Sequence, residues 1–191
     1  DQITFDYLNG RAFVPKGMSW NKVLEYWKNL PTDPGAVFDT EIVLNAEKIE
    51  PMVSWGNTAE ETIPISGFIP DPQGIEDVDR RESLIRALDY MGLNPGMKMI
   101  DIEIDQVFIG SCTNGRLEDL RAAAQIVKGY NATVPALITP GSNAVRAAAE
   151  AEGLDKIFKE AGFTWGEAGC SMCVGMNGDV VGASKRCAST S

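Results

Sequence analysis

The spacing of apolar and polar residues predicts isolated elements in the first half of the chain. Apolar residues within residues 20–30 recur three or four positions apart, which predicts a helix with Ser19 as its N-cap. Residues 38–44 alternate between apolar and polar side chains, as a half-buried strand does. A second amphipathic helix is predicted over residues 81–91, and Gly92 ends it.

Two segments rich in turn-forming residues divide this half of the chain. The Pro- and Gly-containing residues 31–35 predict a boundary. We therefore interpret residues 1–36 as a helical remnant or linker from a preceding domain, and residues 37–191 as one domain. Residues 45–82 predict a long irregular loop, and a loop of this length often lies over a functional site.

From residue 97 onward, short apolar runs alternate with amphipathic segments. The predicted strands cover residues 100–104, 107–109, 136–138 and 163–165. The predicted helices cover residues 117–127, 143–152 and 154–161. Because strands and helices alternate, the sequence predicts an α/β fold with a mostly parallel sheet covered by helices.

Composition and charge exclude several classes of function. The 191 residues carry a net charge of −10. Nucleic acid and anionic membranes both attract basic surfaces, so neither is expected as a partner. No apolar run is long enough to span a bilayer, and no signal peptide is visible, so we expect a cytoplasmic protein with reduced cysteines. The absence of histidine excludes catalysis or zinc binding by that side chain within this chain.

Three of the four cysteines form the most informative pattern in the sequence. Cys170 and Cys173 are three positions apart, and Cys112 lies 58 residues upstream (170 − 112). Cys112 directly follows the predicted strand at 107–109, and the pair follows the predicted strand at 163–165. Ligands of parallel α/β sheets bind at the carboxyl ends of the strands, so these thiols are predicted to converge. Three thiolates can hold an iron–sulfur cube and leave one iron open as a Lewis acid.

Other interpretations of the same residues stay open. Cys112 could be a small buried apolar residue, and the pair could be a redox dithiol. A structural zinc site is also possible if Cys187 supplies a fourth thiolate. Only one pair with this short spacing is present, whereas structural zinc sites usually use two. We therefore interpret Cys187 as a thiol near the site and not as a ligand.

Longer segments around these cysteines resemble a known family. The segments are residues 108–120, 140–142, 151–158, 168–177 and 186–191. They are similar to the aconitase superfamily, and most closely to the family of 3-isopropylmalate dehydratase large subunits. This resemblance implies an aconitase-like three-layer α/β domain with Cys112, Cys170 and Cys173 as ligands of a [4Fe–4S] cluster.

The resemblance also implies an activity and a partner. Members of this family are hydro-lyases that isomerise 2-isopropylmalate and 3-isopropylmalate in leucine biosynthesis by removing and re-adding water. The expected substrate is thus a small hydroxy-diacid, and the expected partner is the small subunit of a heterodimer. Homoaconitase and methylmalate-type dehydratases of the same superfamily remain alternatives.

The sequence also departs from that family. The family's Asp and His residues near the N-terminus, its carboxylate-binding arginines and the serine base of its small subunit have no counterpart here. We therefore assign no catalytic or substrate-binding residue, and we expect an internal or C-terminal fragment that is inactive alone. We expect aerobic handling to remove the cluster and leave free thiols or a Cys170–Cys173 disulfide.

Overall fold

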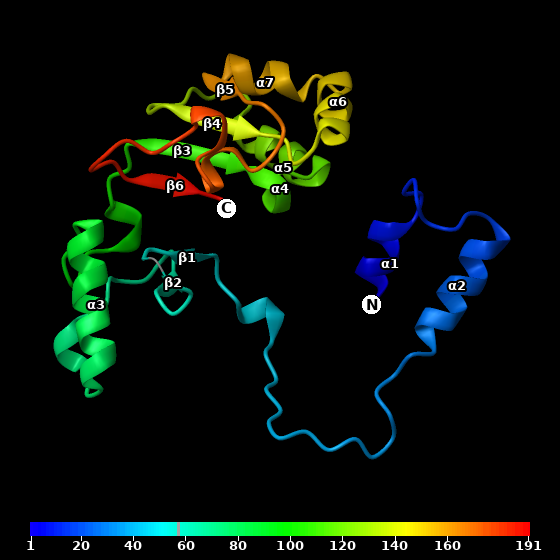
Figure 1. Ribbon diagram of the computed structural model, residues 1–191, viewed down its shortest axis with the longest axis horizontal. Helices are drawn as coiled ribbons and strands as arrows, with labels where there is room; N and C mark the ends of the chain where they lie inside the picture. The colour runs from blue at the N-terminus through cyan, green and yellow to red at the C-terminus, as the bar shows by residue number, and fades with distance from the viewer. Residues whose placement is uncertain (57) are drawn as a thin grey trace. The chain divides into compact units, whose positions relative to one another are not determined.

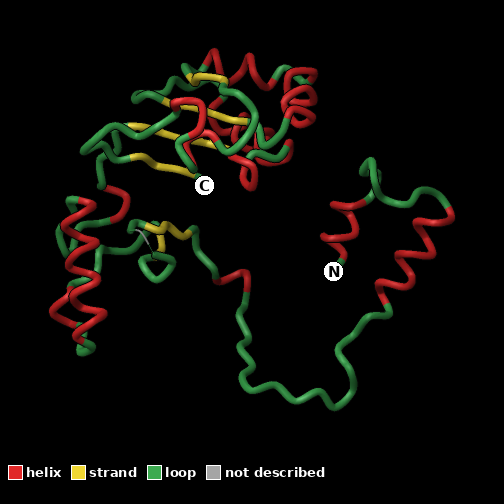
Figure 2. Tube along the Cα trace, in the orientation of Figure 1, coloured by secondary structure: helices red, strands yellow, loops and turns green. Residues whose placement is uncertain are grey.

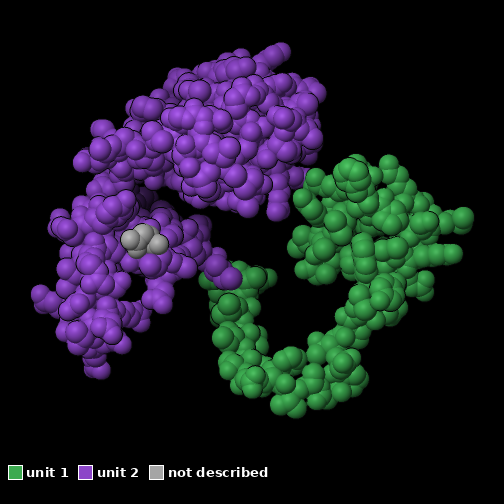
Figure 3. All heavy atoms as spheres, viewed as in Figure 1, with its two compact units in different colours: residues 1–48 green, residues 49–191 purple. Residues whose placement is uncertain are grey.

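The computed structural model describes residues 1–56 and 58–191 (Figure 1). It contains two compact units, residues 1–48 and residues 49–191, which Figure 3 shows in different colours. Each unit is described by itself. A domain boundary after residue 36 stays a prediction, because compact units and domains are defined by different criteria.

The first unit contains two helices, α1 (Gln2–Leu8) and α2 (Met18–Lys28). Helix α2 confirms the predicted helix, although it follows Gly17 and so begins before the expected cap. Aromatic rings join the two helices: the ring of Trp27 lies 6.3 Å from that of Phe5 and 6.0 Å from that of Trp20. Neither helix contains a buried residue, so the Phe5–Trp27 contact is a surface contact between the two helices.

The strand predicted over residues 38–44 is wrong. These residues form a loop, which Figure 2 shows as part of the long stretch without regular structure. Their apolar side chains are exposed, including Ile42, Val43 and Leu44. A strand needs a neighbour to pair with its backbone, and no strand in the described part of the chain pairs with this segment.

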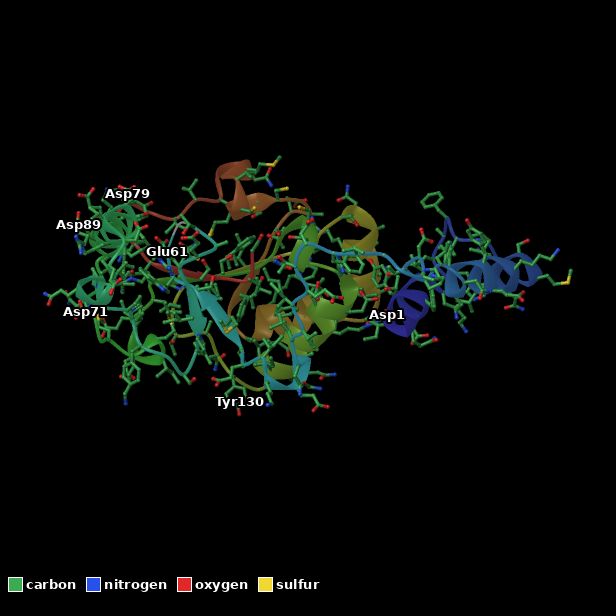
Figure 4. All side chains as sticks on the ribbon, turned by 90° about the horizontal axis from the view of Figure 1, so that it is seen from below. Asp1, Glu61, Asp71, Asp79, Asp89 and Tyr130 are labelled. Carbon is green, nitrogen blue, oxygen red and sulfur yellow. The ribbon has the colours of Figure 1, made fainter. Side chains whose placement is uncertain are left out.

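The second unit begins with a hairpin and a long helix. Strands β1 (Met52–Ser54) and β2 (Thr62–Pro64) pair antiparallel within the region that we predicted to be irregular. The turn between them is stabilised by Glu61 (Figure 4), which is buried and whose carboxylate accepts the Thr58 backbone N–H at 3.2 Å. The irregular-loop prediction therefore missed a hairpin whose strands are only three residues long.

Helix α3 (Val78–Met91) packs against this hairpin. Asp77 caps its first turn, which places the start three residues before the predicted one, while Gly92 ends it in the left-handed conformation as predicted. The helix and hairpin share one buried cluster, formed by Trp55, Ile69, Leu84, Ala87, Leu88, Leu93 and Met99.

A parallel four-stranded sheet forms the centre of the second unit. Its strands, in spatial order, are β5 (Phe163–Trp165), β4 (Ala136–Thr139), β3 (Gln106–Gly110) and β6 (Cys187–Ser189). Strands β3, β4 and β5 confirm predicted strands. The strand predicted at residues 100–104 is wrong, because this region begins with the 3-10 turn Met99–Asp101. Strand β6 was not predicted.

Helices lie beside the sheet (Figure 1), and they pack on it through one apolar core of side chains. They are α5 (Leu117–Val127), α6 (Asn143–Ala151) and α7 (Leu154–Glu160). The short helix α4 (Ser111–Asn114) follows β3 directly and contributes no residue to this core. Leu120, Ile138 and Phe158 are completely buried in this core, and each such side chain contributes about 1.5–3 kcal/mol to stability. The predicted α/β class with a parallel sheet is confirmed. Within the described residues, no helix has both the length and the apolar character needed to cross a bilayer.

Candidate functional site at the carboxyl ends of the strands

The strand order creates a switch point at β3. The chain moves from β3 to β4 and β5 on one side, and then returns to add β6 on the other side. All pairings are parallel, so the four carboxyl ends lie at the same edge of the sheet. Open α/β sheets bind ligands at this kind of edge, next to the strand where the order reverses.

Two glycines allow the turn after β3 to cross the turn after β4. A Cβ on Gly110, whose φ is +119°, would lie 2.0 Å from the Thr139 carbonyl oxygen. A Cβ on Gly115 would lie 2.6 Å from the carbonyl oxygens of both Ser111 and Thr139. Only residues without a side chain fit at these positions. This close crossing explains why the Cys112 turn contains glycine at both ends.

Backbone hydrogen bonds connect the turns that follow β3, β4 and β5, each to the next. The Gly141 N–H, after β4, donates to the Gly115 carbonyl at 2.8 Å. The Gly169 N–H, after β5, donates to the Pro140 carbonyl at 3.0 Å. These two contacts hold the turn before Cys170 beside the turn that contains Cys112.

The structure brings two of the predicted ligand cysteines together. The Sγ atoms of Cys112 and Cys170 are 3.5 Å apart. Cys173 ends the 3-10 turn Ser171–Cys173, and its N–H donates to the Cys170 carbonyl at 3.1 Å. All of these thiols are free, and those of Cys112 and Cys173 are exposed. In the described ranges, however, no three Cys, Asp or Glu side chains are grouped closely enough to hold a metal ion.

The fourth cysteine lies on a neighbouring strand. Cys187 is the first residue of β6, and its Sγ lies 3.9 Å from the Met172 Sδ. Partial burial raises the pKa of the Cys187 thiol. Its contact with a thioether instead of another thiol is compatible with our interpretation of Cys187 as a non-ligand near the site.

The short distance between the Cys112 and Cys170 thiols changes the pKa of Cys170. The pKa of the Cys170 thiol is raised, first by its hydrogen bond with Cys112 and then by the charge of a Cys112 thiolate. Cys173 adds a smaller contribution of the same sign, which is consistent with its position at the end of the same turn. A cation bound between the thiols would remove this mutual repulsion.

Two buried serines flank the close cysteine pair, and sequence reasoning missed their role. Ser111 precedes Cys112 and Ser171 follows Cys170; both are completely buried, with φ of +79° and +50°. The Ser111 hydroxyl lies 2.6 Å from that of Ser191. Serine next to each cysteine was a visible signal, but a sequence does not reveal a left-handed backbone.

Residues after β6 complete the turn that contains Cys112. The Thr190 Oγ accepts the Gly110 N–H at 3.0 Å, and the Asn114 side-chain amide donates to the Thr190 carbonyl. The Thr190 N–H in turn donates to the Phe108 carbonyl at 3.1 Å. The unpredicted strand β6 is therefore part of the framework that positions Cys112.

The fold and the positions of the thiols together indicate the class of protein. A parallel α/β sheet presents thiols from two different turns at its switch point, and such soft ligands suit iron–sulfur clusters and zinc. The model of the aconitase family (aconitate hydratase) matches residues 1–191. The chain therefore belongs to the aconitase family and is a hydro-lyase of that family.

Proposed function

We propose that Cys112, Cys170 and Cys173 are the protein ligands of a [4Fe–4S] cluster. The observation that carries this proposal is the 3.5 Å contact between the Cys112 and Cys170 sulfurs, which come from turns 58 residues apart. Cys173 lies one 3-10 turn beyond Cys170. The donor set therefore fits a cluster in the type of its atoms, and two of its three members already lie together. When bound, such a cluster supplies an open iron that acts as a Lewis acid.

We further propose that the protein is the large subunit of a 3-isopropylmalate dehydratase that acts with a small subunit in the cytoplasm. Its substrates would be 2-isopropylmalate and 3-isopropylmalate, interconverted by dehydration and rehydration in leucine biosynthesis. The segments that flank Cys112 and Cys170 support this choice within the aconitase family. Homoaconitate and methylmalate-type acids are the competing substrates.

Anaerobic reconstitution tests the cluster. The protein is incubated with ferrous iron, sulfide and a thiol reductant, and is then desalted. We expect iron and sulfide to bind in equal amounts, together with the brown absorption of a cluster. Serine variants of Cys112, Cys170 and Cys173 should each lose this colour, whereas Cys187→Ser, the matched control, should keep it. A wild-type protein that binds zinc but neither iron nor sulfide would contradict the proposal.

Substrate choice requires a separate assay. A large subunit that contains residues 1–191 is reconstituted and mixed with a dehydratase small subunit, because residues 1–191 alone are expected to be inactive. Absorbance follows the unsaturated intermediate formed from each acid. We expect turnover of isopropylmalate to exceed that of homoaconitate and methylmalate. Faster turnover of either competitor would assign the protein to another branch of the aconitase family, without affecting the cluster proposal.

A further inference from the structure

The turn that contains Cys170 has an unusual backbone. Ser171, directly after Cys170, has a φ of +50°, although it is not a glycine. Side chains other than glycine seldom adopt this conformation, and it costs free energy unless nearby contacts enforce it. The cost implies that another contact holds Ser171 in place.

Asp179 provides that contact. The completely buried Ser171 hydroxyl donates a hydrogen bond of 2.7 Å to the Asp179 Oδ2. A hydrogen bond to a carboxylate is shorter and stronger than one between neutral groups. Asp179 itself is fixed at the end of the next 3-10 turn, Met176–Gly178, where its N–H donates to the Met176 carbonyl at 3.0 Å.

The contact is placed where it can orient thiols. Ser171 is the residue that immediately follows Cys170 and begins the turn that ends with Cys173. The Val174 N–H also donates to the Ser171 carbonyl at 3.3 Å, so rotation at Ser171 would move the whole turn. Two consecutive 3-10 turns are thus joined by one side-chain hydrogen bond across the Cys170 end of the site.

We infer that Asp179 is a positioning residue, which acts through Ser171 to hold the Cys170 thiol beside Cys112. This inference adds a residue to the proposed cluster site and so rests on the proposed function for its biological meaning. The effect on the thiols themselves can be measured without iron. Its failure is therefore distinguishable from failure of the cluster proposal.

The test measures how readily Cys112 and Cys170 form a disulfide in the metal-free protein, expressed as the effective concentration of one thiol relative to the other. In glutathione redox buffers, glutathione disulfide oxidises Cys112 and Cys170 to one disulfide and is reduced to two glutathione molecules. Peptide mapping after acid quenching gives the equilibrium fraction, and each protein also carries Cys173→Ser and Cys187→Ser to exclude other pairs. We expect Asp179→Ala to lower the effective concentration about tenfold or more.

Conservative variants separate positioning from general loss of structure. Asp179→Asn keeps an oxygen that accepts the Ser171 hydroxyl, so it should recover most of the wild-type value. Ser171→Ala should lower the value as Asp179→Ala does, and combining the two should add little. Asp155→Ala removes a carboxylate whose ion pair is with Lys159 on α7, so it should match the wild type.

Two results would overturn the inference. One is an effective concentration for Asp179→Ala and Ser171→Ala within twofold of the wild type. The other is an Asp179→Asn protein as impaired as Asp179→Ala. If Asp179→Ala does not fold, as judged by circular dichroism, Ser171→Ala and Asp179→Asn decide the question alone. In each case iron binding by the parent protein is a separate measurement.

Discussion

Gly115→Ala provides a direct test of the crossing between strand-end turns. The added Cβ would lie 2.6 Å from two carbonyl oxygens and 2.8 Å from the Gly141 nitrogen. All three contacts are with backbone atoms, which cannot rotate away as a flexible side chain can. Gly115 has no left-handed φ, so the cost comes from this overlap and not from strain at residue 115 itself.

The magnitude follows from these contacts. Overpacking a rigid site typically costs 1–3 kcal/mol, and three simultaneous backbone overlaps place Gly115→Ala at about 3 kcal/mol. For a unit of this size, that corresponds to a fall in Tm of roughly 6–12 °C. The cost should also reach the site, because the Gly141 N–H donates to the Gly115 carbonyl and would be displaced.

Thermal unfolding followed by circular dichroism measures this change. The matched control is Gly74→Ala, because a Cβ at Gly74 meets no atom within 4 Å and its φ is not left-handed. We expect the control to melt at or slightly above the wild-type temperature. If Gly115→Ala melted within about 1 °C of the control, the two turns would not cross as closely as described.

Three further predictions concern other contacts of the second unit. Arg186→Ala should lower the free energy of unfolding by about 1–2 kcal/mol in urea titrations, because the Arg186 guanidinium caps the last carbonyls of α3. Arg186→Lys should recover only part of the lost stability. An alanine variant as stable as the wild type would show that the Arg186 guanidinium does not stabilise the end of α3. The pKa of Asp105 is lowered, first by a hydrogen bond from the Lys185 side chain and then by one from the Arg186 N–H. The stability that these hydrogen bonds contribute should be fully present above the ordinary carboxyl pKa. It should be lost as the pH falls through the lowered pKa of Asp105. Carbon NMR should give a titration midpoint below the ordinary value that rises in Lys185→Ala, and an unshifted midpoint would refute the contact. The 3.5 Å contact between the Cys112 and Cys170 sulfurs replaces our sequence-based expectation of a Cys170–Cys173 disulfide. Oxidation of metal-free protein should therefore join Cys112 to Cys170 in preference to Cys173, as peptide mass spectrometry would show, and the reverse preference would contradict this contact.

The sheet shows which strands a sequence can predict. Strands β3, β4 and β5 are short apolar runs flanked by turn residues, so local pattern is enough to find them. Strand β6 reads Cys-Ala-Ser, and its two final residues are exposed. It is a strand because β3 offers an unpaired edge, which is tertiary information. The opposite error occurred at residues 38–44. Their alternating pattern predicted a strand, but these residues form a loop that pairs with no strand of the described residues.

The candidate site divides in a similar way. Strand-end placement predicted that Cys112 and Cys170 would converge, and the contact between their sulfurs agrees with that part of the prediction. The hydrogen bond between Ser171 and Asp179 was not predicted, because it depends on a left-handed backbone and on a contact between two successive turns. Assignment of the three cysteines as cluster ligands stays a proposal.

The pairing of β6 with β3 has a consequence for the order of folding. Thr190 and Gly110 are joined by a hydrogen bond across 80 positions of sequence. Closing so long a loop costs entropy and slows folding, whereas β3, β4 and their connecting helix associate over shorter separations. We expect nascent or refolding chains to dock β6 last. Until β6 docks, the turn that contains Cys112 lacks its hydrogen bonds to Thr190. We therefore expect Cys112 to be most susceptible to oxidation during this interval.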